Sequence, residues 1–177
     1  MEMNLKLYTQ SENNKKFSAK DIVVTAVLAA LLFAVQIGLS FLPNIELVSL
    51  LIIIYTLIFK EKTIYAIYIF AFLEGVAYGF GVWWFMYLYV WTILYAVTYL
   101  FRRNQSVILW AVISGFFGLS FGALCAIPYF ITGGIGAGIA WWGSGLLFDV
   151  VHGAGNFVVV LVLYKPIFYI LDKVRLV

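Results

Sequence analysis

Long apolar stretches alternate with short polar turns along most of this chain. Apolar residues dominate from 19 to 41, and similar runs follow as far as residue 164. Because an α-helix rises 1.5 Å per residue, about 20 apolar residues are enough to cross a membrane. The pattern therefore predicts an all-α, polytopic membrane protein with six transmembrane helices. The predicted spans cover about 19–41, 45–59, 63–80, 83–100, 106–128 and 139–164.

The composition supports one membrane domain and leaves no room for a separate soluble core. Of the 177 residues, 65% are hydrophobic and 11% are charged, far from the balance of soluble domains. We expect a polar tail over 1–18, a six-helix domain over 19–172 and a short polar end over 173–177. The single cysteine, Cys125, excludes an internal disulfide and a thiolate metal site. No cleavable signal peptide is expected before the first span.

Polar residues mark the starts of three spans. Ser18 and Asp21 have the spacing of a capping box, and Ser106 is placed to cap the fifth span. Glu46 stands at the start of the second span, where the helix dipole favours a carboxylate. Capping is the preferred interpretation of Glu46, with ligand contact as the alternative. The second span is short and must tilt or thin the bilayer.

The basic residues predict the orientation in the membrane. All eleven Lys and Arg lie in the N-terminal tail, the 60–62 turn, the 102–103 turn or the C-terminal end. The positive-inside rule then places both termini in the cytoplasm. Glu46, Glu74, Asp149 and most of the tryptophans consequently lie in the outer half, so a pocket built from them opens away from the cytoplasm.

One face of the last span carries polar residues that need an explanation. If this stretch is helical, Asp149, His152 and Asn156 follow at i, i+3 and i+7 and project from one side. An unpaired acid inside a membrane costs about 3 kcal/mol, so it normally faces a cavity or a partner. We interpret this face as one wall of a binding site. The alternative is that these side chains only join neighbouring helices.

Further candidates for substrate binding lie on other segments. Glu74, in the third span, has no basic residue near it in sequence. Aromatic residues gather at the outer ends of spans, where they either form the interfacial belt or line the mouth of a pocket. The aromatic candidates are Trp83, Trp84, Tyr87, Tyr129 and Trp141.

Small residues recur at helical spacing in two spans. Ala26, Ala30 and Ala34 form a stripe on the first span, either for packing within the chain or for docking onto another membrane subunit. Ala111, Gly115, Gly118, Gly122 and Ala126 form a second stripe on the fifth span, which predicts close helix packing. The glycine-rich stretch 132–138 lacks the lysine of a phosphate loop and is expected to be a flexible loop, or a lid.

The chain resembles the substrate-binding S components of energy-coupling factor (ECF) vitamin transporters. The resemblance is carried by AVLAALLFA (26–34), LPNIELVSLLIIIY (42–55) and GLLFDVVHGAGNFVVVLVLYKP (145–166), and it covers essentially the whole chain. It implies a multi-pass protein of a prokaryotic plasma membrane that captures a vitamin or precursor. Its partner is an ECF module, a transmembrane coupling subunit with two ATPase subunits. The resemblance assigns Ala26, Ala30 and Ala34 to docking on that module.

The residue types in the outer half favour one class of ligand. Acids, an imidazole, an amide and many aromatic rings occur there, without any Lys or Arg to pair with an anionic group. This favours a neutral or cationic heteroaromatic ligand of thiamine, pyrimidine or pyridine type. No enzymatic activity, cofactor or metal is expected.

Two other functions compete with substrate capture. A six-span scaffold that resembles the MreD cell-shape proteins has the same size but does not need acids at membrane depth. A serine hydrolase is disfavoured because Ser144, Asp149 and His152 are too close in one helix to form a triad.

Overall fold

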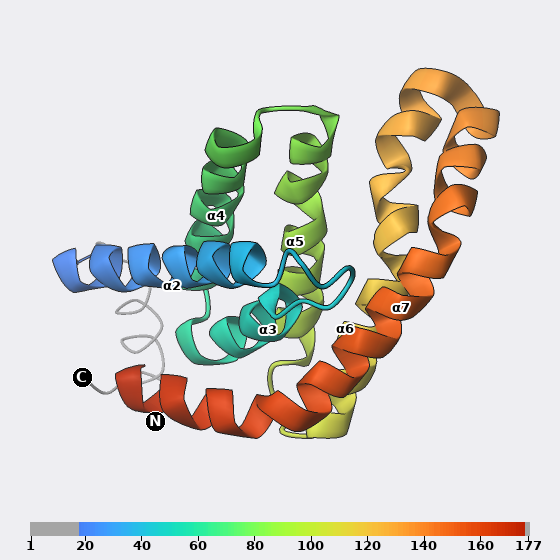
Figure 1. The fold of residues 1–177 in the computed structure, drawn as a ribbon. Helices are drawn as coiled ribbons and strands as arrows, with labels where there is room; N and C mark the ends of the chain where they lie inside the picture. Colours follow the sequence, from blue (N-terminus) through green and yellow to red (C-terminus); the bar gives the residue numbers. More distant parts are fainter. Residues whose placement is uncertain (1–17, 176–177) are drawn as a thin grey trace, which may run out of the picture.

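The computed structural model describes residues 18–175, which form an all-α fold (Figure 1). The described helices are α2 (Ala19–Gly38), α3 (Val48–Phe59), α4 (Lys62–Tyr78), α5 (Val82–Phe101), α6 (Val107–Cys125) and α7 (Ile127–Arg175). The all-α prediction is confirmed for this part of the chain. The predicted polar tail, except Ser18, lies outside the described residues, as do the last two residues of the C-terminal end.

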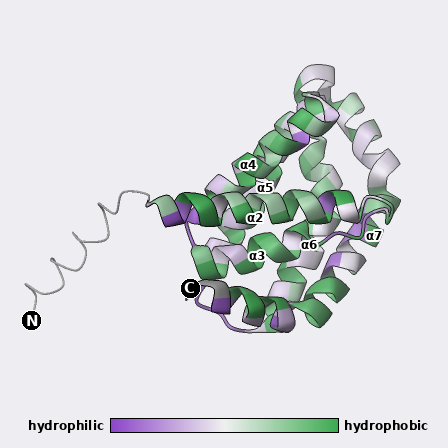
Figure 2. Cartoon of the chain, turned by 60° about the vertical axis from the view of Figure 1, so that its left-hand side comes forward, coloured by the Kyte–Doolittle hydropathy of each residue, from purple (hydrophilic) through white to green (hydrophobic). Residues whose placement is uncertain are grey.

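Four of the described helices are long and apolar enough to cross a membrane. They are α2, α5, α6 and α7, and α3 is a shorter apolar helix. Figure 2 shows hydrophobic residues along most of the helical surface and hydrophilic ones at the start of α2. This supports a polytopic membrane protein, with four rather than six spans established by helix length and composition.

The short helix α3 forms the centre of the fold. It has 12 residues, and all of them except Leu57 are buried. It packs against α5 on one side and against α7 on another. A helix that is apolar on every side is stable only when other elements surround it. α3 therefore joins the part built from α2, α4 and α5 to the part built from α6 and α7.

Two predicted helix starts are confirmed. The Ser18 hydroxyl accepts a hydrogen bond from the Asp21 N–H, and the Asp21 carboxylate accepts one from the Ser18 N–H. The Ser106 hydroxyl accepts a hydrogen bond from the Leu109 N–H at 3.4 Å. These side chains satisfy backbone donors that a helix leaves unpaired at its N-terminus.

The predicted glycine-rich loop is wrong. Residues 132–138 are helical, and the non-helical backbone inside α7 is at Gly134, where φ is 76°. Backbone groups in an apolar environment need internal partners, and a helix supplies them even when glycine is abundant. Gly134 adopts the left-handed region that other residues avoid. The stretch is thus the tip of a helical hairpin, which α6 and α7 form together (Figure 1).

The last helix continues past residue 164, where the sequence predicted the end of the last span. α7 continues through Pro166 to Arg175. Proline lacks an N–H, so it removes one helical hydrogen bond and usually kinks the helix. The helix can continue when the backbone group left without a partner finds another one. Figure 1 shows that α7 curves, so that its C-terminal part lies beneath α3. The residues after 164 therefore continue the helix and cover the core.

The predicted small-residue face of α6 packs closely against α7. A Cβ atom added to Gly118 would lie 2.9 Å from backbone atoms of His152 and Gly153. A Cβ atom added to Gly153 would in turn lie 2.8 Å from the Gly115 carbonyl oxygen. The two backbones approach so closely only because these side chains are absent. This packing fixes the position of the polar face of α7.

Polar contacts join three turns at one end of the molecule. Lys62, at the start of α4, forms an ion pair with Asp21 at the start of α2. The Tyr99 hydroxyl donates to Glu61 at 3.2 Å, which joins the end of α5 to the same turn. Arg102 lies over the Tyr99 ring at 3.6 Å. The basic turns are therefore neighbours in space, away from the segment 39–47 that connects α2 to α3.

Candidate ligand-binding cavity

A cavity of about 620 Å³ lies between the segment 39–47, α5 and the α6/α7 hairpin. Its size is within the range of small-molecule sites. The lining residues are Gln36, Leu39, Ser40, Leu42, Pro43, Asn44, Ile45, Glu46, Tyr87, Trp91, Phe121, Gly122, Trp141, Ser144, Gly145, Phe148, Asp149 and His152. Polar groups and aromatic rings occur together in this set, and it contains no Lys or Arg.

α7 supplies one wall of the cavity through a single helical face. Trp141, Ser144, Phe148, Asp149 and His152 follow at spacings of three, four, one and three residues, so they lie on adjoining turns. The prediction that Asp149 and His152 share a face is confirmed, and both line the cavity. Asn156, one turn further along, is buried but does not line it.

Asp149 joins α7 to α6 through one of its carboxylate oxygens. Its Oδ1 atom accepts a hydrogen bond from the Gly122 N–H at 2.9 Å. Its Oδ2 atom is buried and has no hydrogen-bond partner of normal geometry among the described residues, although the Trp142 side chain approaches the carboxyl group. A Cβ atom at position 122 would lie 2.3 Å from Oδ2, so only glycine leaves room for this carboxylate.

Glu46 connects the segment 39–47 to α7. Its Oε2 atom accepts from the Ser49 N–H at 2.8 Å, which is the predicted capping contact at the start of α3. Its Oε1 atom lies 3.4 Å from His152 Nε2. Glu46 thus serves both as a cap and as a lining residue.

The same connection continues to Asn156. Its Nδ2 atom donates to the Ser49 hydroxyl at 3.2 Å, so Asn156, Ser49, Glu46 and His152 form one chain of contacts. All three residues of the polar α7 face make contacts to other elements, since Asp149 contacts α6, His152 contacts Glu46 and Asn156 contacts Ser49. Asp149 and His152 also line the cavity.

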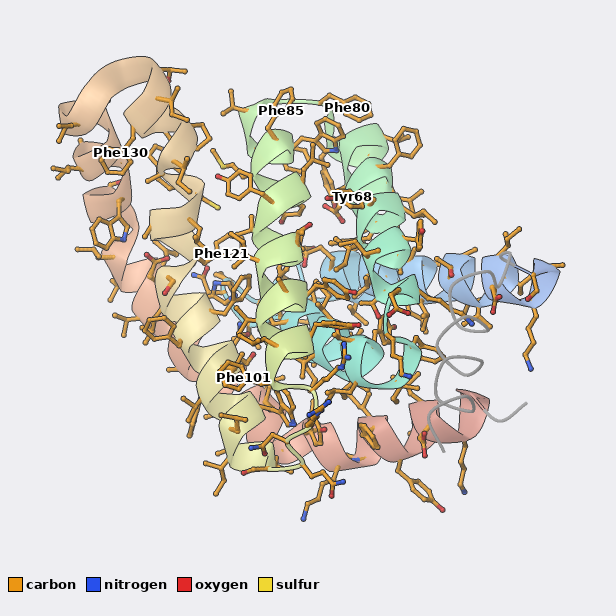
Figure 3. All side chains as sticks on the ribbon, turned by 180° about the vertical axis from the view of Figure 1, so that it is seen from behind. Tyr68, Phe80, Phe85, Phe101, Phe121 and Phe130 are labelled. Atoms are coloured by element: carbon orange, nitrogen blue, oxygen red, sulfur yellow. The ribbon has the colours of Figure 1, made fainter. Side chains whose placement is uncertain are left out.

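Aromatic rings form the wall opposite α7. Tyr87 and Trp91 come from α5, and their ring centroids are 5.6 Å apart. Phe121 comes from α6 and lies 5.7 Å from the Trp91 ring and 5.0 Å from the His152 ring. Figure 3 shows Phe121 on the side of α6 that faces α5. The faces of such rings can stack on a planar ligand.

Two predicted aromatic residues, Trp83 and Tyr129, pack against rings that line the cavity. The Trp83 ring packs edge-on against Tyr87 with centroids 5.3 Å apart. Tyr129 stacks on Trp141 at 4.8 Å. Of these four rings, Tyr87 and Trp141 line the cavity and the other two hold them in place.

Two further predicted site residues lie away from the cavity. Trp84 donates its indole N–H to the Ala71 carbonyl at 2.8 Å and packs against Phe80. Glu74 is 3% exposed, and its Oε1 atom has no hydrogen-bond partner among the described residues. It is close enough to Tyr87 to interact electrostatically, but it does not line the cavity. The structure therefore separates these residues from Asp149 and His152.

Several lining residues were not among the sequence candidates. Gln36 donates to the Tyr87 hydroxyl at 3.5 Å, and Trp91 and Phe121 fill the wall between α5 and α6. The connecting segment 39–47 contributes Asn44 as well. Nothing in the local sequence pattern distinguished these residues as lining residues.

The cavity offers no hydrolytic triad or metal site within residues 18–175. The Ser144 hydroxyl donates to the Trp141 carbonyl at 2.7 Å, a contact inside its own helix. No group of three His, Cys, Asp or Glu side chains in this range is arranged to hold a metal ion. The groups that line the cavity and can contact a ligand are carboxylates, an imidazole, amides and aromatic rings.

The predicted docking stripe lies outside the core. Ala26, Ala30 and Ala34 are all exposed, whereas Leu28 and Leu32 on the opposite side of α2 are buried. Packing within this chain therefore does not explain the stripe.

Models of known protein families, curated protein sequences and solved structures were all compared with the chain, and none of them matches it.

Proposed function

We propose that this protein is the substrate-binding S component of an ECF-type importer, which captures a vitamin or vitamin precursor from outside the cell. The observation that supports this most is the cavity of about 620 Å³ between helices of a membrane protein. It is lined by polar side chains that an apolar bundle does not need for stability. A structural scaffold of the MreD type has no use for such a cavity.

The proposed topology has six spans, with α3 and α4 counted as short ones and both termini in the cytoplasm. The joined basic turns support this orientation, since Lys62, Arg102 and their neighbours gather at one end. The segment 39–47 and the stacked pair Tyr129 and Trp141 then belong to the outer side. In this orientation the cavity faces the outside.

The proposed ligand is a neutral or cationic heteroaromatic molecule of thiamine, pyrimidine or pyridine type. Tyr87, Trp91 and Trp141 provide ring faces for stacking, and Asp149 and Glu46 provide acceptors. A strongly anionic ligand would enter beside two carboxylates without a basic residue to balance it.

The proposed partner is an ECF module in a prokaryotic plasma membrane. The exposed stripe Ala26, Ala30 and Ala34 supports this, because small side chains allow the backbone of a second helix to approach closely. The protein itself binds its substrate and performs no chemical step. Transport then requires the ATPase subunits of the module.

Mass spectrometry of the protein purified from a native-like host tests the proposal. We expect a small heteroaromatic molecule to co-purify with the wild type and to be lost from a His152→Ala variant. The matched control is Glu61→Gln, which removes an acid at the opposite end and should retain the molecule. A folded wild-type protein that carries no small molecule and restores no vitamin uptake with an ECF module would contradict the proposal.

A further inference from the structure

A second pocket, of about 300 Å³, lies at the C-terminal end of α5. It is lined by Tyr99, Leu100, Arg102 and Arg103, and it shares no residue with the cavity described above. The helix α5 is long and apolar enough to cross a membrane, and it ends at Phe101. The two arginines follow directly, so they lie at the depth where the hydrocarbon core meets the headgroups.

The charge of this pocket is positive and largely unbalanced. Both arginines are exposed, and neither forms an ion pair with an acid within residues 18–175, where the ion pairs are Lys62 with Asp21 and His152 with Glu46. Glu61 is the acid beside the pocket, and it accepts a hydrogen bond from the Tyr99 hydroxyl. One carboxylate cannot balance two guanidinium groups, so the pocket attracts an anion.

The Arg102 side chain is held in place before a ligand arrives. Its guanidinium group lies over the Tyr99 ring at 3.6 Å. That ring is fixed in turn by the hydrogen bond to Glu61 at 3.2 Å and by the Tyr95 ring, whose centroid is 5.7 Å away. A guanidinium group donates two parallel N–H bonds to phosphate oxygens. Because the group is already positioned, binding costs less conformational entropy.

Apolar side chains stand directly beside these charges. Leu100, which lines the pocket, is 77% exposed, and the neighbouring Phe101 is 45% exposed. A soluble phosphate would contact the guanidinium groups and leave these side chains unused. A phospholipid carries a phosphate and an acyl chain in the same molecule, so it matches both parts of the surface.

We propose that this pocket binds the phosphate group of an anionic phospholipid, with an acyl chain of that lipid against Leu100. The ligand is a component of the membrane and not a transported substrate. The site requires only that α5 spans a membrane, so it holds or fails independently of the S-component function.

Native mass spectrometry of the full chain in detergent tests the proposal with three probes. They are dioleoylphosphatidylglycerol, which is anionic, dioleoylphosphatidylcholine, which is zwitterionic, and glycerophosphate, which has the phosphate without acyl chains. We expect the first to bind at least about tenfold more tightly than the second, since two arginines at a membrane surface each attract an anionic headgroup. Glycerophosphate should bind more weakly than the anionic lipid.

The variant Arg102→Gln/Arg103→Gln should bind the two lipids with nearly equal affinity. The matched control is Lys165→Gln/Lys173→Gln, which also removes two exposed positive charges. Lys173 likewise lies over a tyrosine ring, at 4.2 Å from the Tyr169 centroid, but neither lysine lines this pocket. The control should keep the wild-type preference for the anionic lipid.

Three results would overturn the proposal. Equal affinity of the wild type for the two lipids would show that the pocket does not select an anionic headgroup, and this comparison needs no variant to fold. Equal affinity for glycerophosphate and the anionic lipid would assign the pocket to a soluble phosphate compound. An equal loss of preference in the lysine control would mean that the overall charge of the protein, and not this pocket, holds the lipid.

Discussion

Two stripes of small residues lie on α2 and α6, and their surroundings are opposite. Gly115, Gly118 and Gly122 on α6 are buried against α7, where an added Cβ would meet backbone or the Asp149 carboxylate. Ala26, Ala30 and Ala34 on α2 are exposed. Similar helical spacing therefore does not reveal whether a stripe packs inside the chain or remains available to a partner.

The residue type separates the two stripes better than their spacing does. Glycine weakens a helix by about 1 kcal/mol relative to alanine, and the α6 glycines offset this cost because an added methyl group would meet α7. Alanine keeps full helix propensity and still leaves a shallow surface. Substitutions that add bulk to each stripe should show this difference directly.

The largest effect is expected from Gly118→Ala. The new methyl group would lie 2.9 Å from the backbone of α7, which cannot move without disturbing the hairpin. We expect the free energy of unfolding to fall by about 3 kcal/mol, the upper part of the range for overpacking. Denaturant unfolding in detergent, followed by circular dichroism, measures this change.

The matched control is Gly143→Ala, which adds the same methyl group to α7 where no atom lies within 4 Å. It should leave stability unchanged or raise it by up to about 1 kcal/mol, since alanine favours helix. Equal losses in both variants would mean that glycine packing does not hold the hairpin together.

A smaller loss of stability is expected from Gly122→Ala. The added methyl group would meet the Asp149 side chain, which can move more easily than the α7 backbone. The methyl group would displace the Asp149 carboxylate, which loses its hydrogen bond from the Gly122 N–H. We expect a loss of about 2 kcal/mol in stability, together with weaker ligand binding. Unfolding and calorimetric binding should be measured on the same preparation. Intact binding beside reduced stability would remove Asp149 from the site.

Asn156→Ala should cost about 1 kcal/mol of stability, the usual contribution of one hydrogen bond. The variant removes the donor to Ser49 but leaves every cavity-lining residue in place. Ligand affinity should therefore remain at the wild-type value, which calorimetry checks. A loss of affinity without a loss of stability would instead restore Asn156 to the binding site.

The smallest change in stability, below about 0.5 kcal/mol, is expected from Ala30→Trp, because this position is exposed. Ligand binding should also be unchanged, whereas uptake with an ECF module should be abolished. Leu31→Trp, which adds bulk further around α2, is the control and should retain uptake. If Ala30→Trp loses binding and uptake together, the stripe does not act as a docking face.

Local patterns predicted the features that depend on neighbouring residues. The Ser18 and Asp21 capping box and the small face of α6 were correct because three or four residues determine each of them. The shared face of Asp149 and His152 was correct for the same reason. The loop predicted at 132–138 was wrong because glycine content was given more weight than the need of a backbone in an apolar environment for internal hydrogen bonds, and only Gly134 departs from helical geometry.

The contacts of the site that could not be predicted join residues that are far apart in the sequence. Glu46 and His152 are 106 positions apart in the chain, and Asn156 and Ser49 are 107 apart. Nothing near Glu46 in the sequence indicates that α7 will lie beside it. Glu74 is the reverse case. As an isolated acid in an apolar span it was predicted to bind substrate, but the arrangement of the helices leaves it outside the cavity.

The buried helix α3 also constrains how the protein is made. At about 18 Å in length it is shorter than a bilayer core of about 30 Å, so as a span it depends on the helices that surround it. The helices that cover it, α5 and α7, follow it in the chain and are therefore synthesised later. We therefore expect the burial of α3 to be completed only after its last covering helix, α7, has been synthesised.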